Sequence, residues 1–486
     1  MGQEQRLAFL AVEGLDDWRV AYCGPIARFA TGSVRAGAAF AAAVAELDEL
    51  AGHPPLVDVR PDGVIVRIVA DLAELDDGAA ERARAISAVA RAQGLTADPG
   101  RVQDVQVAVA TRLPIDEVLP FWRAVLGYAD HVGDDLVDPL GRMPSIWFQP
   151  LDPAKPLRHA MHLDLSMPRE VASARLAATL AAGGRLAFDA EAPQYWTCAD
   201  AAGNKVDLVT WPDLPVPEDA PASLDVVAIP RAGARDGATR PDMAQGPVGA
   251  SPERRPRVAA GPGDLEHGEA MWMAFRAASD LVDWPIVSWG PTAWFRTGSL
   301  AASAALARDL ADLAGSDRMH LDLRADGIAV RLARDESRLV EADLALARRV
   351  SETARAAGAR SDPSMVQTVQ IAIASKADDD VRPAWRELFD YAELGTEDLV
   401  DPDGRGPGLW FQELPAEKPL RHAFHLDVSV PRPVGRARVA AAVRAGGRIA
   451  AGSEATGWWT LADPAGNKAD ISVWADRADG VGRAEP

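Results

Sequence analysis

The chain carries a long internal repeat. Residues 15–213 and 281–476 run in parallel, with an offset that drifts only from 266 to 263. The matched landmarks are Gly24-Pro25 with Gly290-Pro291, Lys155-Pro156-Leu157-Arg158-His159 with Lys418-Pro419-Leu420-Arg421-His422, and Gly203-Asn204-Lys205 with Gly466-Asn467-Lys468. The fold must therefore be a unit that occurs twice, and each motif can be tested against its twin. Residues that differ between the copies are poor candidates for chemistry that both copies share.

Composition excludes several classes of protein. A chain of 486 residues is too long for one core and should form three or more domains. Its net charge of −20 argues against a nucleic-acid partner, since phosphate contact needs clustered Lys and Arg. No apolar run reaches the roughly 20 residues of a membrane span, and the N-terminus lacks the layout of a signal peptide. A small-molecule ligand is the better expectation.

The two cysteines, Cys23 and Cys198, lie in different segments and have no twin in the second copy. This usage excludes a disulfide framework or a thiolate zinc site. It fits a reducing compartment, and the expected location is cytoplasmic.

The first segment of each half (about 15–96 and 281–360) is predicted to be helix, hairpin, helix. Ser33 is a plausible N-cap before residues with helical spacing that run to Gly52. Asp62-Gly63 lies between two alternating stretches and indicates a hairpin, as does Asp326-Gly327 in the second copy.

The second segment (about 102–213 and 366–476) predicts two β-α-β-β-β modules in series. The stretch 214–262 is rich in Pro, Ala, Gly and Arg without periodicity, which indicates a flexible linker. The predicted domains are 1–96 and 263–362 for the first type, 100–213 and 364–476 for the second, with 214–262 as linker and 477–486 as a loose tail. The fold class is α+β throughout.

The first segment resembles pterin-4a-carbinolamine dehydratases in length, element order and hairpin position. That family uses a His-His-Pro run and a third histidine as acid and base to remove water from a 4a-hydroxytetrahydropterin. The first copy keeps His53-Pro54, with Gly52 and Ala70 at the other two histidine positions, and the second copy has Ser316-Asp317-Arg318 instead of the run. The resemblance implies an antiparallel sheet with helices on one face, and His53 as the remaining catalytic residue. The alternative interpretation of His53 is a loop histidine that caps a helix end.

The second segment resembles the glyoxalase-like branch of the vicinal oxygen chelate superfamily, which includes glyoxalases, extradiol dioxygenases and antibiotic-resistance proteins. The resemblance is carried by Phe121-Trp122-Arg123-Ala124-Val125-Leu126-Gly127-Tyr128, His162-Leu163-Asp164 and Asp200-Ala201-Ala202-Gly203-Asn204-Lys205, and by Trp385-Arg386-Glu387-Leu388-Phe389-Asp390-Tyr391, His425-Leu426-Asp427 and Asp463-Pro464-Ala465-Gly466-Asn467-Lys468. It implies cupped mixed sheets that bind a small molecule.

Members of that superfamily that bind metal take ligands from the first and last strands of each module. The resemblance therefore implies a divalent metal in the first copy, held by Asp104, His162 and Asp207 with Gln149 nearby. The second copy has Thr368 at the first of these positions, followed by Gln412, His425 and Asp470. Imidazole with carboxylates suits Fe(II), Mn(II), Ni(II) or Zn(II). No other cofactor is implied.

The repeated His-x-Asp has two interpretations. On a strand, His162 and Asp164 point to one face and His159 to the other. His162 and its twin His425 would then be catalytic, as ligands or proton donors oriented by the aspartate. The other interpretation is a buried His–Asp hydrogen bond that stabilises the sheet. Both remain open.

Nine of the fourteen tryptophans lie in the two glyoxalase-like segments. Flat aromatic walls with a few polar groups are typical of sites for planar organic molecules. The residues expected to line such a cleft are Trp147, Gln149, Trp196, Trp410, Gln412 and Trp459. Core packing is the alternative for some of them, and Trp122, on a helix, is expected in the core.

The leading hypothesis is a glyoxalase-like small-molecule-binding protein or metabolic enzyme with an aromatic cleft, in which the dehydratase-like domains are scaffold. One alternative is a 4a-hydroxytetrahydrobiopterin (pterin-4a-carbinolamine) dehydratase-type lyase at His53. Another is a metal-dependent lyase, isomerase or dioxygenase at Asp104, His162 and Asp207. The two halves are expected to pair as an intramolecular pseudo-dimer. Ligand identity, catalysis and further association of whole chains stay open.

Overall fold

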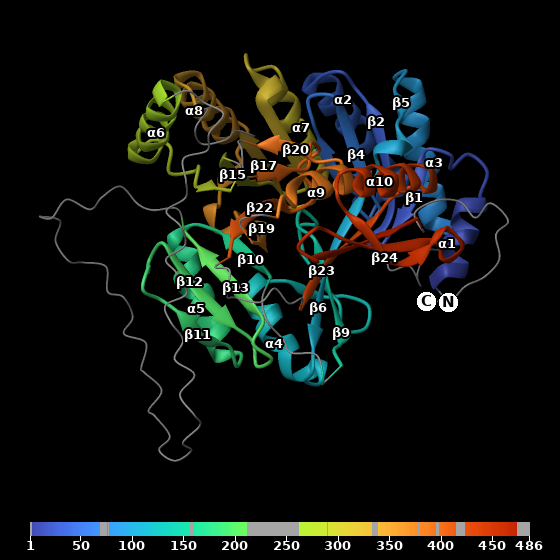
Figure 1. Ribbon diagram of the computed structural model, residues 1–486. Helices are drawn as coiled ribbons and strands as arrows, with labels where there is room; N and C mark the ends of the chain where they lie inside the picture. Colours follow the sequence, from blue (N-terminus) through green and yellow to red (C-terminus); the bar gives the residue numbers. More distant parts are fainter. Residues whose placement is uncertain are drawn as a thin grey trace, which may run out of the picture.

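The computed structural model describes residues 2–68, 75, 77–152, 154, 160–210, 262–288, 290–332, 339–376, 379–394, 398–414 and 423–473. The expected linker, apart from residue 262, and the tail lie outside these ranges. The described residues form an α+β structure with three sheets, one of ten strands and two of eight. Each sheet contains strands from both halves of the chain (Figure 1).

The ten-stranded sheet is antiparallel, in the order β1-β2-β4-β3-β16-β17-β15-β14, with β5 paired to β2 and β18 to β15. Its strands are β1 (Trp18–Ala21), β2 (Gly24–Ala30), β3 (Leu56–Val59), β4 (Gly63–Arg67), β5 (Thr96–Ala97), β14 (Ile286–Val287), β15 (Gly290–Arg296), β16 (Met319–Leu323), β17 (Gly327–Leu332) and β18 (Arg360–Ser361). The predicted hairpin around Asp62-Gly63 is β3–β4. The halves join where β3 pairs with β16, which places Asp58 opposite Asp322. Two predicted sheets are thus one continuous sheet.

One face of this sheet is apolar and covered by helices. The helices of these units are α1 (Gly2–Ala11), α2 (Val34–Ala45), α3 (Asp77–Ala92), α6 (Pro262–Ala277), α7 (Leu300–Ala311) and α8 (Glu341–Ala356), with 3₁₀ turns η1 (Asp48–Leu50), η3 (Pro99–Arg101), η4 (Ser316–Arg318) and η6 (Pro363–Met365). The predicted cap is confirmed, because Ser33 Oγ accepts a hydrogen bond from the Ala36 amide. Alternation along each strand puts Val57 and Val59 in this core and leaves Asp58 on the opposite face.

The opposite face is a buried layer of arginines and aspartates. Arg60 lies 2.8 Å from Asp322, and Arg324 lies 2.8 Å from Asp58, so each half supplies one residue to each pair. Arg60 also donates to the backbone carbonyl of Asp403, in a loop of a glyoxalase-like segment. These buried contacts connect the ten-stranded sheet to the rest of the molecule.

The two eight-stranded sheets are mixed, in the orders β11-β12-β13-β10-β19-β22-β21-β20 and β24-β25-β26-β23-β6-β9-β8-β7. The strands from the first half are β6 (Asp104–Thr111), β7 (Ala129–Asp130), β8 (Leu136–Val137), β9 (Ser145–Pro150), β10 (Met161–Ser166), β11 (Arg185–Phe188), β12 (Tyr195–Ala199) and β13 (Lys205–Val209). Those from the second half are β19 (Thr368–Ser375), β20 (Ala392–Leu394), β21 (Asp398–Val400), β22 (Gly408–Glu413), β23 (Phe424–Ser429), β24 (Arg448–Ser453), β25 (Trp458–Ala462) and β26 (Lys468–Ser472).

Modules pair across the halves. The second module of the first half joins the first module of the second half where β10 runs antiparallel to β19, and the reciprocal pair is β23 with β6. Strands β6 and β19 are buried along their whole length, so they need a hydrogen-bonded neighbour on each side. This exchange decides which residues can share a site.

Four helices cover the apolar face of the eight-stranded sheets: α4 (Ile115–Leu126), α5 (Arg169–Ala181), α9 (Arg382–Phe389) and α10 (Arg432–Arg444). A 3₁₀ turn, η7 (Glu454–Thr456), precedes β25. Trp122 is fully buried, as predicted, and its indole Nε1 donates to Asp200. Leu163 and Ile371 belong to the same core, so the residues that alternate with them lie on the other face.

Candidate functional site

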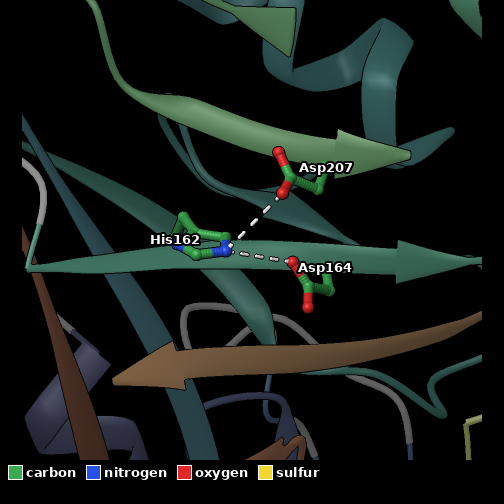
Figure 2. Close-up of side chains that lie close together, drawn as sticks. All are labelled: His162, Asp164 and Asp207. Atoms are coloured by element: carbon green, nitrogen blue, oxygen red, sulfur yellow. Dashed lines mark ion pairs between the residues drawn. The ribbon is translucent and has the colours of Figure 1, made fainter. Parts of the chain in front are cut away.

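A histidine and two aspartates meet on the polar face of β10 and β13. His162 and Asp164 lie on the same face of β10, and the parallel register places Asp207 of β13 beside Asp164. His162 Nε2 is 3.3 Å from Asp164 Oδ1 and 3.6 Å from Asp207 Oδ2 (Figure 2). One potential ligand atom from each residue lies within 4.8 Å of the others, and we call this group the His162 cluster.

The same group recurs in the second half as the His425 cluster. His425 Nε2 is 3.2 Å from Asp427 Oδ1 and 4.0 Å from Asp470 Oδ2. All three residues again offer ligand atoms within 4.8 Å of one another. The sequence predicted a ligand set in the first copy alone, whereas the structure places equivalent donors in both.

Each cluster is completed by side chains of the opposite half. Trp410 of β22 donates from Nε1 to Asp164 Oδ2 at 2.7 Å, and its ring lies edge-on to His162 at 6.0 Å. The amide of Gln412 lies 3.4 Å from His162 Nδ1. The register explains these contacts, because His162 pairs with Ala372 and Ala372 pairs with Trp410 across three adjacent strands.

The His425 cluster has the reciprocal arrangement. Trp147 donates to Asp427 Oδ2 at 2.5 Å, and the Gln149 amide lies 3.2 Å from His425 Nδ1. The sequence predicted that Gln149 lies near His162, and this prediction is wrong. Gln149 and His162 lie in different sheets because the modules pair across the halves.

Asp104 does not join His162 and Asp207. It lies on β6, in the other eight-stranded sheet, and forms an ion pair with Arg67 at 2.8 Å. Its Oδ2 also accepts a hydrogen bond from the backbone amide of Cys23. The position that the resemblance gave to a ligand is thus used to connect two parts of the fold.

Trp196 and Trp459 lie away from the clusters, contrary to the expected cleft. Trp196 is paired with Leu208 and Trp459 with Ile471, and both tryptophans pack against the core on the helix-covered face. The period of two along a strand accounts for this, since neighbouring Thr197, not Trp196, shares a face with Asp207.

His53 is exposed and lies in the loop before β3, outside both clusters. Its ring Nδ1 is 3.3 Å from the carbonyl of Ala51 in the same loop. His159, His422 and Ala70 lie outside the described residues.

Three residues beside the clusters were missed from the sequence. The hydroxyl of Thr197 donates to Asp207, and Thr460 does the same for Asp470. Gln370, opposite Asp164 on β19, accepts a hydrogen bond from Ser288 at 2.8 Å. The Trp-Thr pair present in both copies was the available signal for the threonines. The sequence predicted the tryptophan of that pair at the site instead of the threonine.

Electrostatics separate the members of the His162 cluster. Burial would lower the pKa of His162, but the charges of Asp164 and Asp207 outweigh it and raise that pKa above its usual value. Burial raises the pKa of Asp207 to about 6, although the nearby His162 acts in the opposite direction. The pKa of His425 is raised in the same way, with Asp427 as the main opposing partner to burial.

The clusters fit a divalent cation. Asp207 Oδ1 is buried and accepts no hydrogen bond from the described residues, while Asp164 Oδ1 and Asp427 Oδ1 face a histidine nitrogen at 3.3 and 3.2 Å. Two carboxylates so close together repel each other when both are charged, and a cation between them would remove that cost. One imidazole, two carboxylates and the nearby amide of Gln412 form a donor set that suits Mn(II), Fe(II), Ni(II) or Zn(II).

Trp410→Phe should weaken metal binding at the His162 cluster about tenfold, because the indole N–H that orients Asp164 is lost while the ring is kept. Titration with Co(II), followed by its visible absorption, measures this. Trp147→Phe is the matched control and should affect only the other cluster. Equal effects of both substitutions on His425→Ala protein would contradict the assignment.

Known protein families match the second segment of each half. Residues 106–209 and 370–472 each match the family model described as Glyoxalase-like domain, so the chain contains two glyoxalase-like domains. Both clusters lie inside the matched segments. Among solved structures, a mutant of glyoxalase I from Zea mays has 8% identity and a TM-score of 0.28, covering 78% of this chain and 95% of that one. No curated protein matches the chain. None of the described helices is long and apolar enough to cross a membrane.

Proposed function

We propose that the chain binds small oxygen-bearing organic molecules at two glyoxalase-like sites, each built around a divalent metal ion. His162, Asp164 and Asp207 would hold one ion, and His425, Asp427 and Asp470 the other. The observation that carries the proposal is the meeting of one imidazole and two carboxylates within 4.8 Å of one another, found in both halves. A bound ion of this kind polarises a carbonyl or lowers the pKa of a coordinated water.

The surrounding residues orient the donors. Trp410 fixes Asp164, Thr197 fixes Asp207, and the Gln412 amide contacts the second nitrogen of the His162 ring. A hydrogen bond to the far side of a ligand sets the direction of its lone pair. Lys205, on the same face of β13 as Asp207, would favour a ligand that carries negative charge.

A metal-free function has one observation in its favour. His162 Nε2 lies 3.3 Å from Asp164 Oδ1, and the charges of Asp164 and Asp207 raise the pKa of His162, which favours the protonated ring. Such a pair can donate a proton to a bound ligand. In contrast, the dehydratase alternative rests on His53, which is exposed and whose ring contacts the backbone carbonyl of Ala51.

Metal content decides between these functions. Protein purified without a His-tag and reconstituted with Mn(II), Fe(II), Co(II), Ni(II) or Zn(II) should hold two ions per chain by elemental mass spectrometry. His162→Ala and His425→Ala should each hold one ion, and the double variant none. His53→Ala is the control and should keep two. Wild-type protein that holds no stoichiometric ion after reconstitution would reject the metal sites and leave the metal-free function.

The pKa of Asp207 makes a second test. Its value of about 6 lies above the ordinary 3.8, so the charged form is disfavoured in the fold. The group therefore contributes stability below pH 3.8 that is lost as pH rises through 6, and above pH 6 its charge costs at most about 3 kcal/mol. In metal-free protein, Asp207→Asn should raise the free energy of unfolding by about 1–3 kcal/mol at pH 8 and change it little at pH 4. Thermal unfolding at both pH values measures this, and a variant less stable than wild type at pH 8 would refute it.

A further inference from the structure

The two sites differ at their outer edge, where strands β11 and β24 border them. Phe188 lies opposite Thr197 in the first half, and Ala451 lies opposite Thr460 in the second. The next residue on the same face is Tyr195 in the first half and Trp458 in the second. The first site thus has two aromatic rings at its edge, whereas the second has the larger ring of Trp458 and only the methyl group of Ala451.

In the first site the aromatic pair is complete. The rings of Phe188 and Tyr195 are stacked, with centroids 5.6 Å apart and planes inclined by 19°. They lie on the polar face of the sheet, because Thr197, which shares this face, donates to Asp207. The protein's own Phe188 thus occupies the stacking position over Tyr195.

In the second site Ala451 stands where Phe188 would be, and Trp458 is partly exposed. The indole ring of Trp458 lies against the backbone of Gly452. A Cβ at position 452 would lie only 2.9 Å from Trp458 Cε3, and the φ of Gly452 is +77°, which favours glycine. The first half has Asp189 at this position. A glycine at position 452 thus leaves room for the indole ring at the edge of the second site.

The carboxylates of the second site are also more open. The side chain of Asp427 is 17% exposed against 6% for Asp164, and that of Asp470 is 31% exposed against 16% for Asp207. A larger ligand can therefore approach the His425 cluster than can approach the His162 cluster.

We infer that the His425 site takes a ligand with a planar aromatic ring, stacked on Trp458 in the position that Phe188 fills in the other site, while the His162 site takes a smaller, non-aromatic ligand. Trp458 and Thr460 are two residues apart, about 7 Å along the strand, and Thr460 contacts Asp470. That spacing fits one ring joined directly to a pair of oxygen atoms. The inference rests on the proposed function for the oxygen end of the ligand.

Benzohydroxamate and acetohydroxamate test this, because they share one metal-chelating group and differ in the ring. Calorimetric titration of Mn(II)-loaded His162→Ala protein, which retains the second site, should show benzohydroxamate binding about tenfold more tightly than acetohydroxamate. Adding Ala451→Phe should abolish that preference and leave acetohydroxamate binding unchanged. Trp458→Leu should abolish it as well, which guards against a folding defect in either variant.

The first site supplies the converse experiment. Mn(II)-loaded His425→Ala protein should show no preference between the two probes, and adding Phe188→Ala should create one by opening the space over Tyr195. Equal binding of both probes to His162→Ala protein, or the same aromatic preference at both sites, would overturn the inference while leaving the proposed function intact. Failure of the wild-type chain to bind either Mn(II) or acetohydroxamate would overturn both.

Discussion

Asp322→Ala is expected to lower the free energy of unfolding by about 3–5 kcal/mol, because it leaves a buried guanidinium without its carboxylate. Arg60 and Asp322 are 1% and 4% exposed, and their contact spans the two halves of the chain at 2.8 Å. Burial would raise the pKa of Asp322, but Arg60 and Arg324 hold it well below its ordinary value of 3.8. The stabilisation is therefore complete above pH 3.8 and declines as pH falls below it.

Urea unfolding followed by tryptophan fluorescence measures this loss. The matched control is Asp312→Ala, whose partner Arg35 also lies in the other half, at 2.7 Å. Both of these side chains are more than 60% exposed, so the control should cost less than about 1 kcal/mol. If both substitutions lower the free energy of unfolding by the same amount, burial does not account for the contribution of the Arg60–Asp322 pair.

Cutting the chain between residues 213 and 262 is expected to leave the two fragments together, with both proposed metal sites intact. All three sheets contain strands of both halves, joined by β3–β16, β10–β19 and β23–β6. Separation would expose the buried strands β6 and β19 along one edge and the cores beneath them. The fragments should therefore coelute at the native size and part only in denaturant.

A protease site introduced near residue 240 allows this test, with protease-treated wild-type chain as the control. The fragments also permit a crossed experiment. A wild-type first fragment, refolded with a second fragment that carries Trp410→Phe, should show weakened Co(II) binding at His162, which belongs to the other fragment. Fragments that separate at micromolar concentration, or a defect confined to the mutated fragment's own histidine, would contradict the exchange of modules.

Much of the local structure could be predicted from the sequence, because it depends on nearby residues. The cap at Ser33 and the hairpin at Asp62-Gly63 are short-range features with their own chemistry, and both are present. The duplication also gave the correct count of glyoxalase-like domains. The burial of Trp122 follows from its place on an amphipathic helix.

The composition of the site could not be predicted, because it depends on which strands pair at long range. His162 and Asp207 could be placed together from one module, but their neighbours depend on whether β10 pairs with β6 or with β19. Both choices bury similar strands, so the sequence pattern does not distinguish them. Trp196 shows a second limit: a shift of one residue moves a side chain to the other face, and Thr197 held the position expected for the tryptophan.

The exchange of modules also affects how the two sites can evolve. In a dimer of identical chains every substitution appears in both sites at once, so the sites cannot specialise. Here Phe188 and Ala451 are separate codons of one gene, and each site can change its ligand alone. Each site nevertheless takes Trp410 or Trp147 from the other half, so neither half can be deleted or replaced without damage to both sites. Duplication within one chain thus lets the two sites diverge separately while both still depend on the whole gene.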